Sequence, residues 1–214
     1  VARDHLAFSG AGDVVREVYS LHATKPFGIA EGCAIFAPES KVPSLRAAMN
    51  FGLQTHSATG DPQAPFWGIN GKMSELHAAV GLAVADTMAT RVAARQDMAA
   101  NWVGCLENSS ATIFNTVIEA SPWQVFPVLL ESEAQVLATV ENAAARNIEL
   151  RRYYSPSLGA CQGMTQVGPC SNARNLAKRA LTLPVRSTMN AADQDDLMAN
   201  VRACIDLGHA GMRA

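Results

Sequence analysis

Hydrophobic residues change their spacing along this chain, and each spacing predicts a different kind of element. Residues 14–19 and 34–36 are β-branched or aromatic runs that predict two strands joined by an irregular loop. Residues 43–50 fit a short helix, and the glycine- and proline-rich stretch 51–71 predicts a loop. From residue 72 the apolar positions follow helical spacing, which predicts one long helix that ends at 102 or 106.

The second half of the chain consists of shorter elements. Residues 124–130 are almost wholly apolar and predict a strand, in which Pro127 favours an edge position or a bulge. Ser132 is a candidate N-cap for the helix that follows it. The remaining predictions are strands at 112–115, 148–150 and 180–183, and helices at 132–146, 172–179 and 191–207. Such a mixture predicts a small α/β-type domain.

The composition is that of a globular protein with no preference for polyanions. Of the 214 residues, 49% are hydrophobic and 17% are charged, which argues against disorder, and the net charge of −2 gives no reason to expect nucleic acid or a membrane as partner. No apolar run approaches the roughly 20 residues that span a bilayer, and no signal-peptide pattern follows the N-terminus, so a cytoplasmic protein is the default expectation. The histidines form no metal-ligand pair, and the cysteines predict free, mostly buried thiols.

The loop between the first two predicted strands carries the clearest chemistry. Lys25 lies on this loop, which is braced by a strand on each side. A lysine amine forms an imine with an aldehyde cofactor when its neighbours hold it and keep it partly neutral. Ser20, at the start of the loop, is a hydroxyl suited to donate to a phosphate. Pyridoxal phosphate (PLP) needs such an amine and is suited by such a hydroxyl. The alternatives at this point are a solvated surface lysine and a serine that merely ends a strand.

Several motifs, in the same order along the chain, resemble those of the DegT/DnrJ/StrS family of PLP-dependent sugar aminotransferases. The segment SLHATKPFGIAEGC at 20–33 resembles the family's cofactor-lysine segment. The further matches are the LR…NFG stretch at 45–52, the G-x-N-x-R-M-x-E motif at 68–76, the R-x-Y-x-P segment at 152–156 and the late L-x-L-P at 181–184. The resemblance therefore covers most of the chain.

The resemblance implies a fold, a reaction and an assembly. The fold is α/β, PLP fold type I, similar to aspartate aminotransferase. The reaction is PLP-dependent transfer of an amino group from glutamate to a nucleotide-linked ketosugar, carried out by a cytoplasmic homodimer. In the family, the lysine that matches Lys25 binds PLP as an imine and moves the catalytic proton. Ser20 is expected to bond the cofactor phosphate, and Asn70 to reach that phosphate from the neighbouring subunit. Lys25 argues against the sugar-dehydratase branch, which has histidine there.

Four positions leave alternatives open. Lys72 replaces the family's usual arginine, which keeps the charge and loses the planar fork. Cys33 stands where the family has a glycine, which is harmless in an extended strand and strained at positive φ. Asn70 is also a typical turn residue. His22 suits a general base or a packing and hydrogen-bonding role, and we favour the second because Lys25 already supplies proton transfer.

Length predicts a portion of a larger enzyme. Family members are nearly twice as long, with the lysine near mid-chain, so the chain resembles their C-terminal portion. We expect residues 1–90 to complete the large PLP-binding domain and 91–214 to form a small C-terminal domain. The remaining groups of a PLP site come, in the family, from before the lysine segment, and Asp4 and Asp13 are poor substitutes for its carboxylate. A non-catalytic fragment that keeps only the fold and the dimer surface is the alternative.

Overall fold

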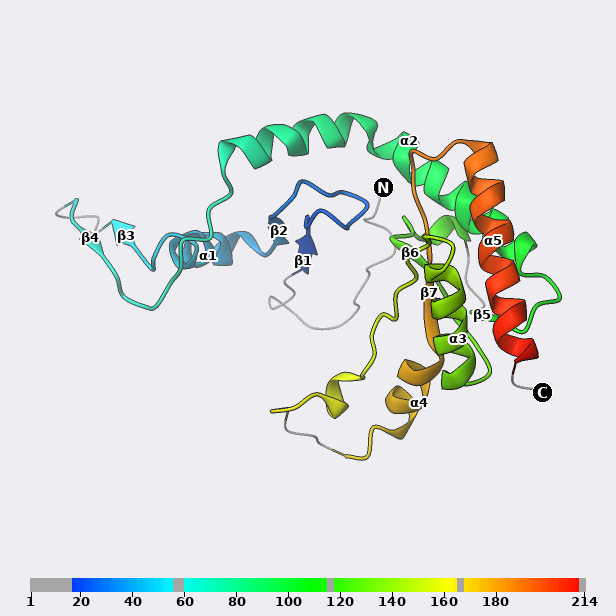
Figure 1. The fold of residues 1–214 in the computed structure, drawn as a ribbon. Helices are drawn as coiled ribbons and strands as arrows, with labels where there is room; N and C mark the ends of the chain where they lie inside the picture. Colours follow the sequence, from blue (N-terminus) through cyan, green and yellow to red (C-terminus); the bar gives the residue numbers. More distant parts are fainter. Residues whose placement is uncertain (1–16, 56–59, 115–117, 165–167, 212–214) are drawn as a thin grey trace. The chain divides into compact units, whose positions relative to one another are not determined.

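The computed structural model describes residues 17–55, 60–114, 118–164 and 168–211 (Figure 1). The chain forms two compact units, Val1–Met88 and Ala89–Ala214, each described by itself below. Their boundary falls within a long helix, α2 (Glu75–Cys105). Within the described ranges, no helix is long and apolar enough to cross a bilayer. Asp4 and Asp13 lie outside those ranges.

The first unit contains two small antiparallel hairpins, a short helix and the first part of α2 (Figure 1). Its elements are β1 (Glu17–Ser20), β2 (Cys33–Phe36), a 3₁₀ turn (Glu39–Lys41), α1 (Val42–Ala48), β3 (Gln54–Thr55) and β4 (Pro62–Gln63). β1 pairs with β2, and β3 with β4. Pro43 lies in the first turn of α1, where its missing N–H interrupts no helical bond. The short helix and the second strand are confirmed, and so is the first strand from residue 17 on, since residues 14–16 lie outside the described ranges. In the described part of the predicted loop, residues 51–55 and 60–71, the regular elements are the two-residue strands β3 and β4.

The second unit is a three-stranded antiparallel sheet, in the order β5-β6-β7, packed against helices. Its elements after α2 are β5 (Thr112–Ile113), a 3₁₀ turn (Ile118–Ala120), β6 (Val125–Leu129), α3 (Glu133–Ala144), a 3₁₀ turn (Leu158–Ala160), α4 (Ser171–Arg179), β7 (Ala180–Pro184) and α5 (Ala191–Ala210). The register pairs Phe126 with Leu183 and Val128 with Leu181, and all four side chains are fully buried. They form one core with the end of α2 and with α3 and α5, which pack against each other.

Side-chain caps fix where two of the helices begin. Ser132 caps α3 as predicted, because its hydroxyl oxygen accepts the N–H of Gln135 at 3.1 Å. α2 begins at Glu75 rather than at residue 72. The reason is a similar contact, in which the hydroxyl oxygen of Ser74 accepts the N–H of His77 at 3.2 Å.

Three predictions are wrong, two of them for elements of the second half. β6 is the middle strand of its sheet although it contains Pro127. Because β5 pairs only with Val128 and Leu129, Pro127 faces a strand on one side alone, where a residue without an N–H is tolerated. Residues 148–150 form no strand.

The five cysteines are free as expected, yet only Cys204 is buried, because the others lie in loops or at the ends of elements.

Arg95 of α2 donates hydrogen bonds to the backbone at one end of the β6–β7 pair. Its Nη1 donates to the carbonyl oxygen of Trp123, just before β6, at 2.9 Å, and to that of Val185, just after β7, at 3.0 Å. Burial lowers the pKa of this guanidinium, and the nearby charge of Arg91 lowers it further. The carbonyl dipoles offset part of that cost, because hydrogen bonds to an ionised donor are stronger than neutral ones.

We expect Arg95→Met to lower the free energy of unfolding by about 1–3 kcal/mol, the cost of leaving buried acceptors without a donor. Methionine keeps much of the apolar stem, so the loss reports mainly on the hydrogen bonds. Chemical denaturation measures it. Asp97→Asn, at an exposed position of the same helix, is the control and should leave the midpoint unchanged. Equal stability of Arg95→Met and wild type would contradict this role.

Candidate functional site

The loop that carries Lys25 is closed by the pairing of β1 with β2. Beyond the strands its two limbs stay joined. The N–H of Leu21 donates to the carbonyl oxygen of Gly32 at 2.9 Å, and that of Ala23 donates to Ala30 at 2.7 Å. The residues between Ala23 and Ala30 form the short tip of the loop, and Lys25 lies in this tip.

Gly28 allows the tip to fold back on itself. A Cβ atom at this position would lie 2.5 Å from the carbonyl oxygen of Ala23 and 3.1 Å from that of Lys25, so no larger residue fits without displacing the backbone. On the other side of the tip, the N–H of Lys25 donates to the carbonyl oxygen of His22 at 2.8 Å. The backbone of Lys25 is therefore held by a turn on one side and by close packing on the other.

Ser20 and Lys25, two of the predicted site residues, lie on the same hairpin. Ser20 is the last residue of β1, and its exposed hydroxyl oxygen accepts the N–H of His22 at 3.4 Å while keeping its own hydrogen to donate. Lys25 is half-buried. A primary amine and a hydroxyl on one loop suit an aldehyde that carries a phosphate. In the described part of the chain, no three His, Cys, Asp or Glu side chains cluster to hold a metal ion.

The geometry of this hairpin bears on two positions that the sequence left open. His22 Nδ1 lies 2.7 Å from Glu31 Oε1, which agrees with a hydrogen-bonding role. Cys33 is the first residue of β2 and pairs with Ser20 in extended backbone, so the cysteine is unstrained. Sequence reasoning did not single out Glu31, although it stands in the E-G step that follows the lysine.

Asn70 lies on a segment fastened to the end of α1. The N–H of Ile69 donates to the carbonyl oxygen of Ala48 at 2.8 Å, and the N–H of Phe51 donates to Ile69 at 3.0 Å. Asn70 itself forms a single antiparallel bridge with Asn50, and its side chain is exposed. The backbone thus fixes the position of Asn70 and leaves its amide group available to another molecule.

Two motif glycines make this fastening possible. Gly52 is buried with a φ of 76°, and a Cβ there would collide with the carbonyl oxygen of Phe66. A Cβ on Gly68 would collide with the backbone nitrogen of Gly52. The backbones of the two motifs are therefore in direct contact, and the need for glycine at both positions is steric.

Lys72, which stands where the family has arginine, adds side-chain contacts between the two motifs. Its Nζ donates to Asn50 Oδ1 at 2.9 Å and lies 4.8 Å from the ring centroid of Phe51. One donor and one cation–π contact suffice here, so the planar fork of arginine is not required for these contacts. Asn50 and Phe51 were not predicted as partners, although both stand in the NFG stretch.

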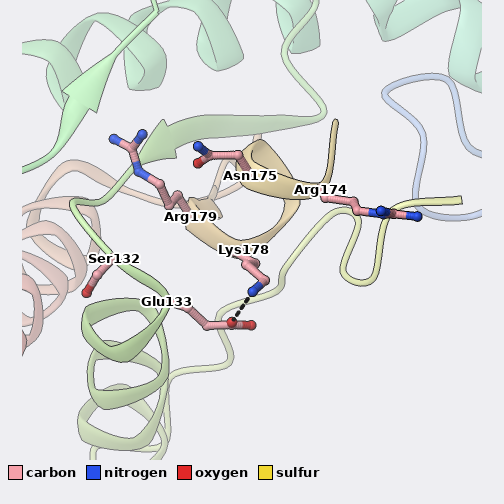
Figure 2. A pocket seen from close by; sticks show the side chains of 6 residues that line it. All are labelled: Ser132, Glu133, Arg174, Asn175, Lys178 and Arg179. Atoms are coloured by element: carbon pink, nitrogen blue, oxygen red, sulfur yellow. Dashed lines mark ion pairs between the residues drawn. The ribbon is translucent and has the colours of Figure 1, made fainter. Parts of the chain in front are cut away.

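The second unit contains an open hollow of about 480 Å³ that none of the predicted site residues lines. Figure 2 shows its lining, which consists of Ser132, Glu133, Arg174, Asn175, Lys178 and Arg179. Glu133 Oε1 lies 2.9 Å from Arg152 Nη2, and its Oε2 lies 3.8 Å from Lys178 Nζ. Arg179 Nε donates to the carbonyl oxygen of Leu130 at 2.8 Å. These contacts fasten α4 to α3 and to the end of β6, which is a structural role.

Arg151, directly before the R-x-Y-x-P segment at 152–156, is held by two side-chain hydrogen bonds, and the segment itself presents a pair of aromatic rings. Arg151 Nε donates to Glu149 Oε1 at 2.8 Å and its Nη1 donates to the hydroxyl of Tyr153 at 3.0 Å. These bonds raise the pKa of Arg151, the one to Glu149 most. The rings of Tyr153 and Tyr154 lie 4.9 Å apart, and Tyr154 is largely exposed.

Comparison with known proteins gives consistent matches over most of the chain. The sequence profile of the DegT/DnrJ/EryC1/StrS aminotransferase family matches residues 9–202. The dTDP-4-amino-4,6-dideoxy-D-glucose transaminase of Shigella dysenteriae is 29% identical over 208 residues, which are 89% of this chain and 54% of that protein.

Solved structures of aminotransferases share the fold. Aminotransferase TlmJ from Streptoalloteichus hindustanus superposes with a TM-score of 0.80 at 16% identity, over 96% of this chain and 56% of that one. Helicobacter pylori PseC, an aminotransferase involved in the biosynthesis of pseudoaminic acid, superposes with a TM-score of 0.79 at 18% identity, over 90% and 53%. The chain spans about half the length of these relatives.

We expect Gly28→Ala to open the loop, because the new methyl group collides with the carbonyl oxygen of Ala23. Hydrogen exchange at the amides of Ala23 and Ile29 should become roughly five- to 150-fold faster, from the 1–3 kcal/mol typical of overpacking. Gly81→Ala is the matched control, since its Cβ would lie 3.7 Å from the side chain of Ile29, an ordinary contact. Unchanged exchange in Gly28→Ala would refute the steric argument.

Proposed function

Because this chain belongs to the DegT/DnrJ/EryC1/StrS aminotransferase family, we propose that it is the lysine-bearing part of a PLP-dependent sugar aminotransferase. Its fold is α/β, PLP fold type I. The reaction we propose is amino transfer from glutamate to a nucleotide-linked ketosugar, in line with the dTDP-sugar transaminase of Shigella dysenteriae. The observation that carries the proposal is the closed loop with Lys25 at its tip and Ser20 at its base.

The side chains on the loop fit PLP. An aldehyde condenses with a primary amine, and a phosphate accepts hydrogen bonds from hydroxyl and amide groups. Lys25 offers the amine and Ser20 the hydroxyl. We propose that these two residues of one subunit, with the side-chain amide of Asn70 from a second subunit, hold the cofactor. We also assign residues 1–90 to the large domain and 91–214 to the small one.

Lys25 carries the proton transfer in this proposal. When bound, PLP supplies an electron sink that makes a hydrogen on the amino-bearing carbon acidic. Lys25 Nζ would move that proton between the amino-bearing carbon and C4′ of the cofactor, which requires an amine that is neutral for part of the cycle. The turn at His22 and the packing of Gly28 hold the Lys25 backbone, so that Nζ returns to the same place. Ser20 orients the phosphate by donating its hydroxyl hydrogen.

A homodimer is part of the proposal, with a second copy of this chain covering the segment around Asn70. Trp67 is 84% exposed, Ile69 52% and Leu76 80%. Apolar side chains gathered at a surface are typical of protein interfaces. Burying these residues against a second subunit would carry Asn70 toward the partner's cofactor, the role that the family resemblance implies.

A second candidate is a non-catalytic fragment that keeps the fold and the dimer surface. The observation in its favour is that the chain spans about half the length of its relatives. In the family, the carboxylate and the ring-stacking group of the cofactor site precede the lysine segment. The two candidates differ in whether this chain, given PLP, forms a bond to Lys25.

Lys25→Ala should abolish both transamination and covalent capture of PLP. After incubation with PLP and reduction with borohydride, peptide mass analysis should find the adduct on Lys25 of the wild type and no adduct on that peptide of the variant. Lys41→Ala, in the same unit, is the control and should keep the adduct. Ser20→Ala should keep it too, with PLP binding weakened by roughly 10- to 150-fold, as expected for a lost hydrogen bond to a charged group. A wild type without an adduct favours the fragment.

Mixed dimers test the contribution of Asn70 across the interface. Homodimers of Asn70→Ala should bind PLP weakly, and homodimers of Lys25→Ala should be inactive. A dimer of one Asn70→Ala and one Lys25→Ala subunit should recover one working site, which combines the intact Lys25 of one chain with the intact Asn70 of the other. Activity is measured on differently tagged, co-purified dimers. Absence of recovery, with sedimentation showing dimers, would place Asn70 in its own subunit's site.

A further inference from the structure

The geometry points to a positioning role for His22, whose bridge to Glu31 holds the Lys25 loop in the conformation needed for cofactor attachment. The inference rests on the proposed function, because it concerns the placement of the proposed cofactor lysine. It assigns His22 no contact with substrate or with the reacting atoms.

His22 is the residue through which both proposed cofactor residues of this loop are connected. Its backbone N–H donates to the hydroxyl oxygen of Ser20 at 3.4 Å. Its carbonyl oxygen accepts the N–H of Lys25 at 2.8 Å. Its side chain reaches the opposite limb, where Nδ1 lies 2.7 Å from Glu31 Oε1. A shift of His22 therefore changes the separation between the hydroxyl of Ser20 and the amine of Lys25.

The backbone that leads from the tip of the loop back to β2 places Glu31 next to His22. Ala30, directly before Glu31, has a φ of 80°, a left-handed conformation that costs a non-glycine residue about 1–2 kcal/mol. Such a conformation persists where surrounding contacts impose it. Here the carbonyl oxygen of Ala30 accepts the N–H of Ala23 at 2.7 Å, while the next residue makes the side-chain bridge.

The hydrogen bond also assigns the tautomer of the imidazole. A carboxylate only accepts hydrogen bonds, so Nδ1 carries the hydrogen that it donates to Glu31. An asparagine side chain places an N–H₂ donor close to the position of Nδ1 and has no basic nitrogen. His22→Asn therefore keeps the bridge and removes any general base, whereas His22→Ala removes both.

The experiment combines hydrogen exchange of the chain without PLP with the rate of borohydride-trapped PLP attachment to Lys25. Exposed charged pairs contribute little, so His22→Ala and Glu31→Ala should each speed exchange at the Ala23 and Lys25 amides roughly two- to fivefold. The double variant should add nothing further. Glu149→Ala is a matched control, because the Arg151–Glu149 pair is 52% and 73% exposed and the His22–Glu31 pair 47% and 72%. It should leave exchange in the loop unchanged.

Each outcome decides the inference. Faster exchange in His22→Ala with slower PLP attachment, both restored in His22→Asn, supports positioning. Unchanged exchange in His22→Ala, or additive effects of the two single variants, overturns it. Normal exchange in His22→Asn with PLP attachment still lost also overturns it, in favour of acid–base chemistry at His22. If no chain attaches PLP, the proposed function fails, and the exchange pattern alone still shows whether the bridge holds the loop.

Discussion

The closure of the β1–β2 hairpin is the constraint on which the candidate site depends. Each strand is only four residues long, and the loop between them has little hydrophobic support. Ile29 is the exception. It is almost fully buried, and its side chain lies close to Gly81 of α2. The backbone around Lys25 is thus held by hydrogen bonds within the loop and by one buried isoleucine.

The two units are stabilised in different ways. The second unit has one continuous core, in which the buried Gln135 donates to Ser110 Oγ at 2.6 Å and accepts the N–H of Glu131 at 3.0 Å. Among its described residues, the first unit buries few large side chains and leaves Trp67 and Leu76 in solvent. Exposed apolar area of this kind is what the proposed second subunit would cover.

The sequence predicted the features that depend on local pattern and missed those that depend on contacts between distant residues. Helical spacing located α2, while its first residue depended on a hydroxyl contact of Ser74 that spacing does not report. Pro127 was misjudged because strand order is a tertiary property, and β5 is too short to reach it. The loop with Ser20 and Lys25 was predictable, since both residues lie between two strand signals.

The partners of those site residues were not predictable in the same way. Glu31 bonds His22 across nine positions, and Asn50 meets Lys72 across twenty-two. No periodicity joins residues so far apart, and only the folded chain shows which side chains meet. The motifs contain all four residues, but the motifs alone do not show which residue contacts which.

The contact between Gly52 and Gly68 has a consequence for how such sequences evolve. Neither glycine touches a proposed cofactor group; Gly52 is required because the backbone of Phe66 lies against it, and Gly68 because the backbone of Gly52 lies against it. Selection on the two codons is therefore coupled, and it is independent of selection on the lysine. A descendant that lost the amine and its chemistry would still have to retain both glycines to fold, so their presence in a sequence identifies the scaffold and carries no information about catalysis.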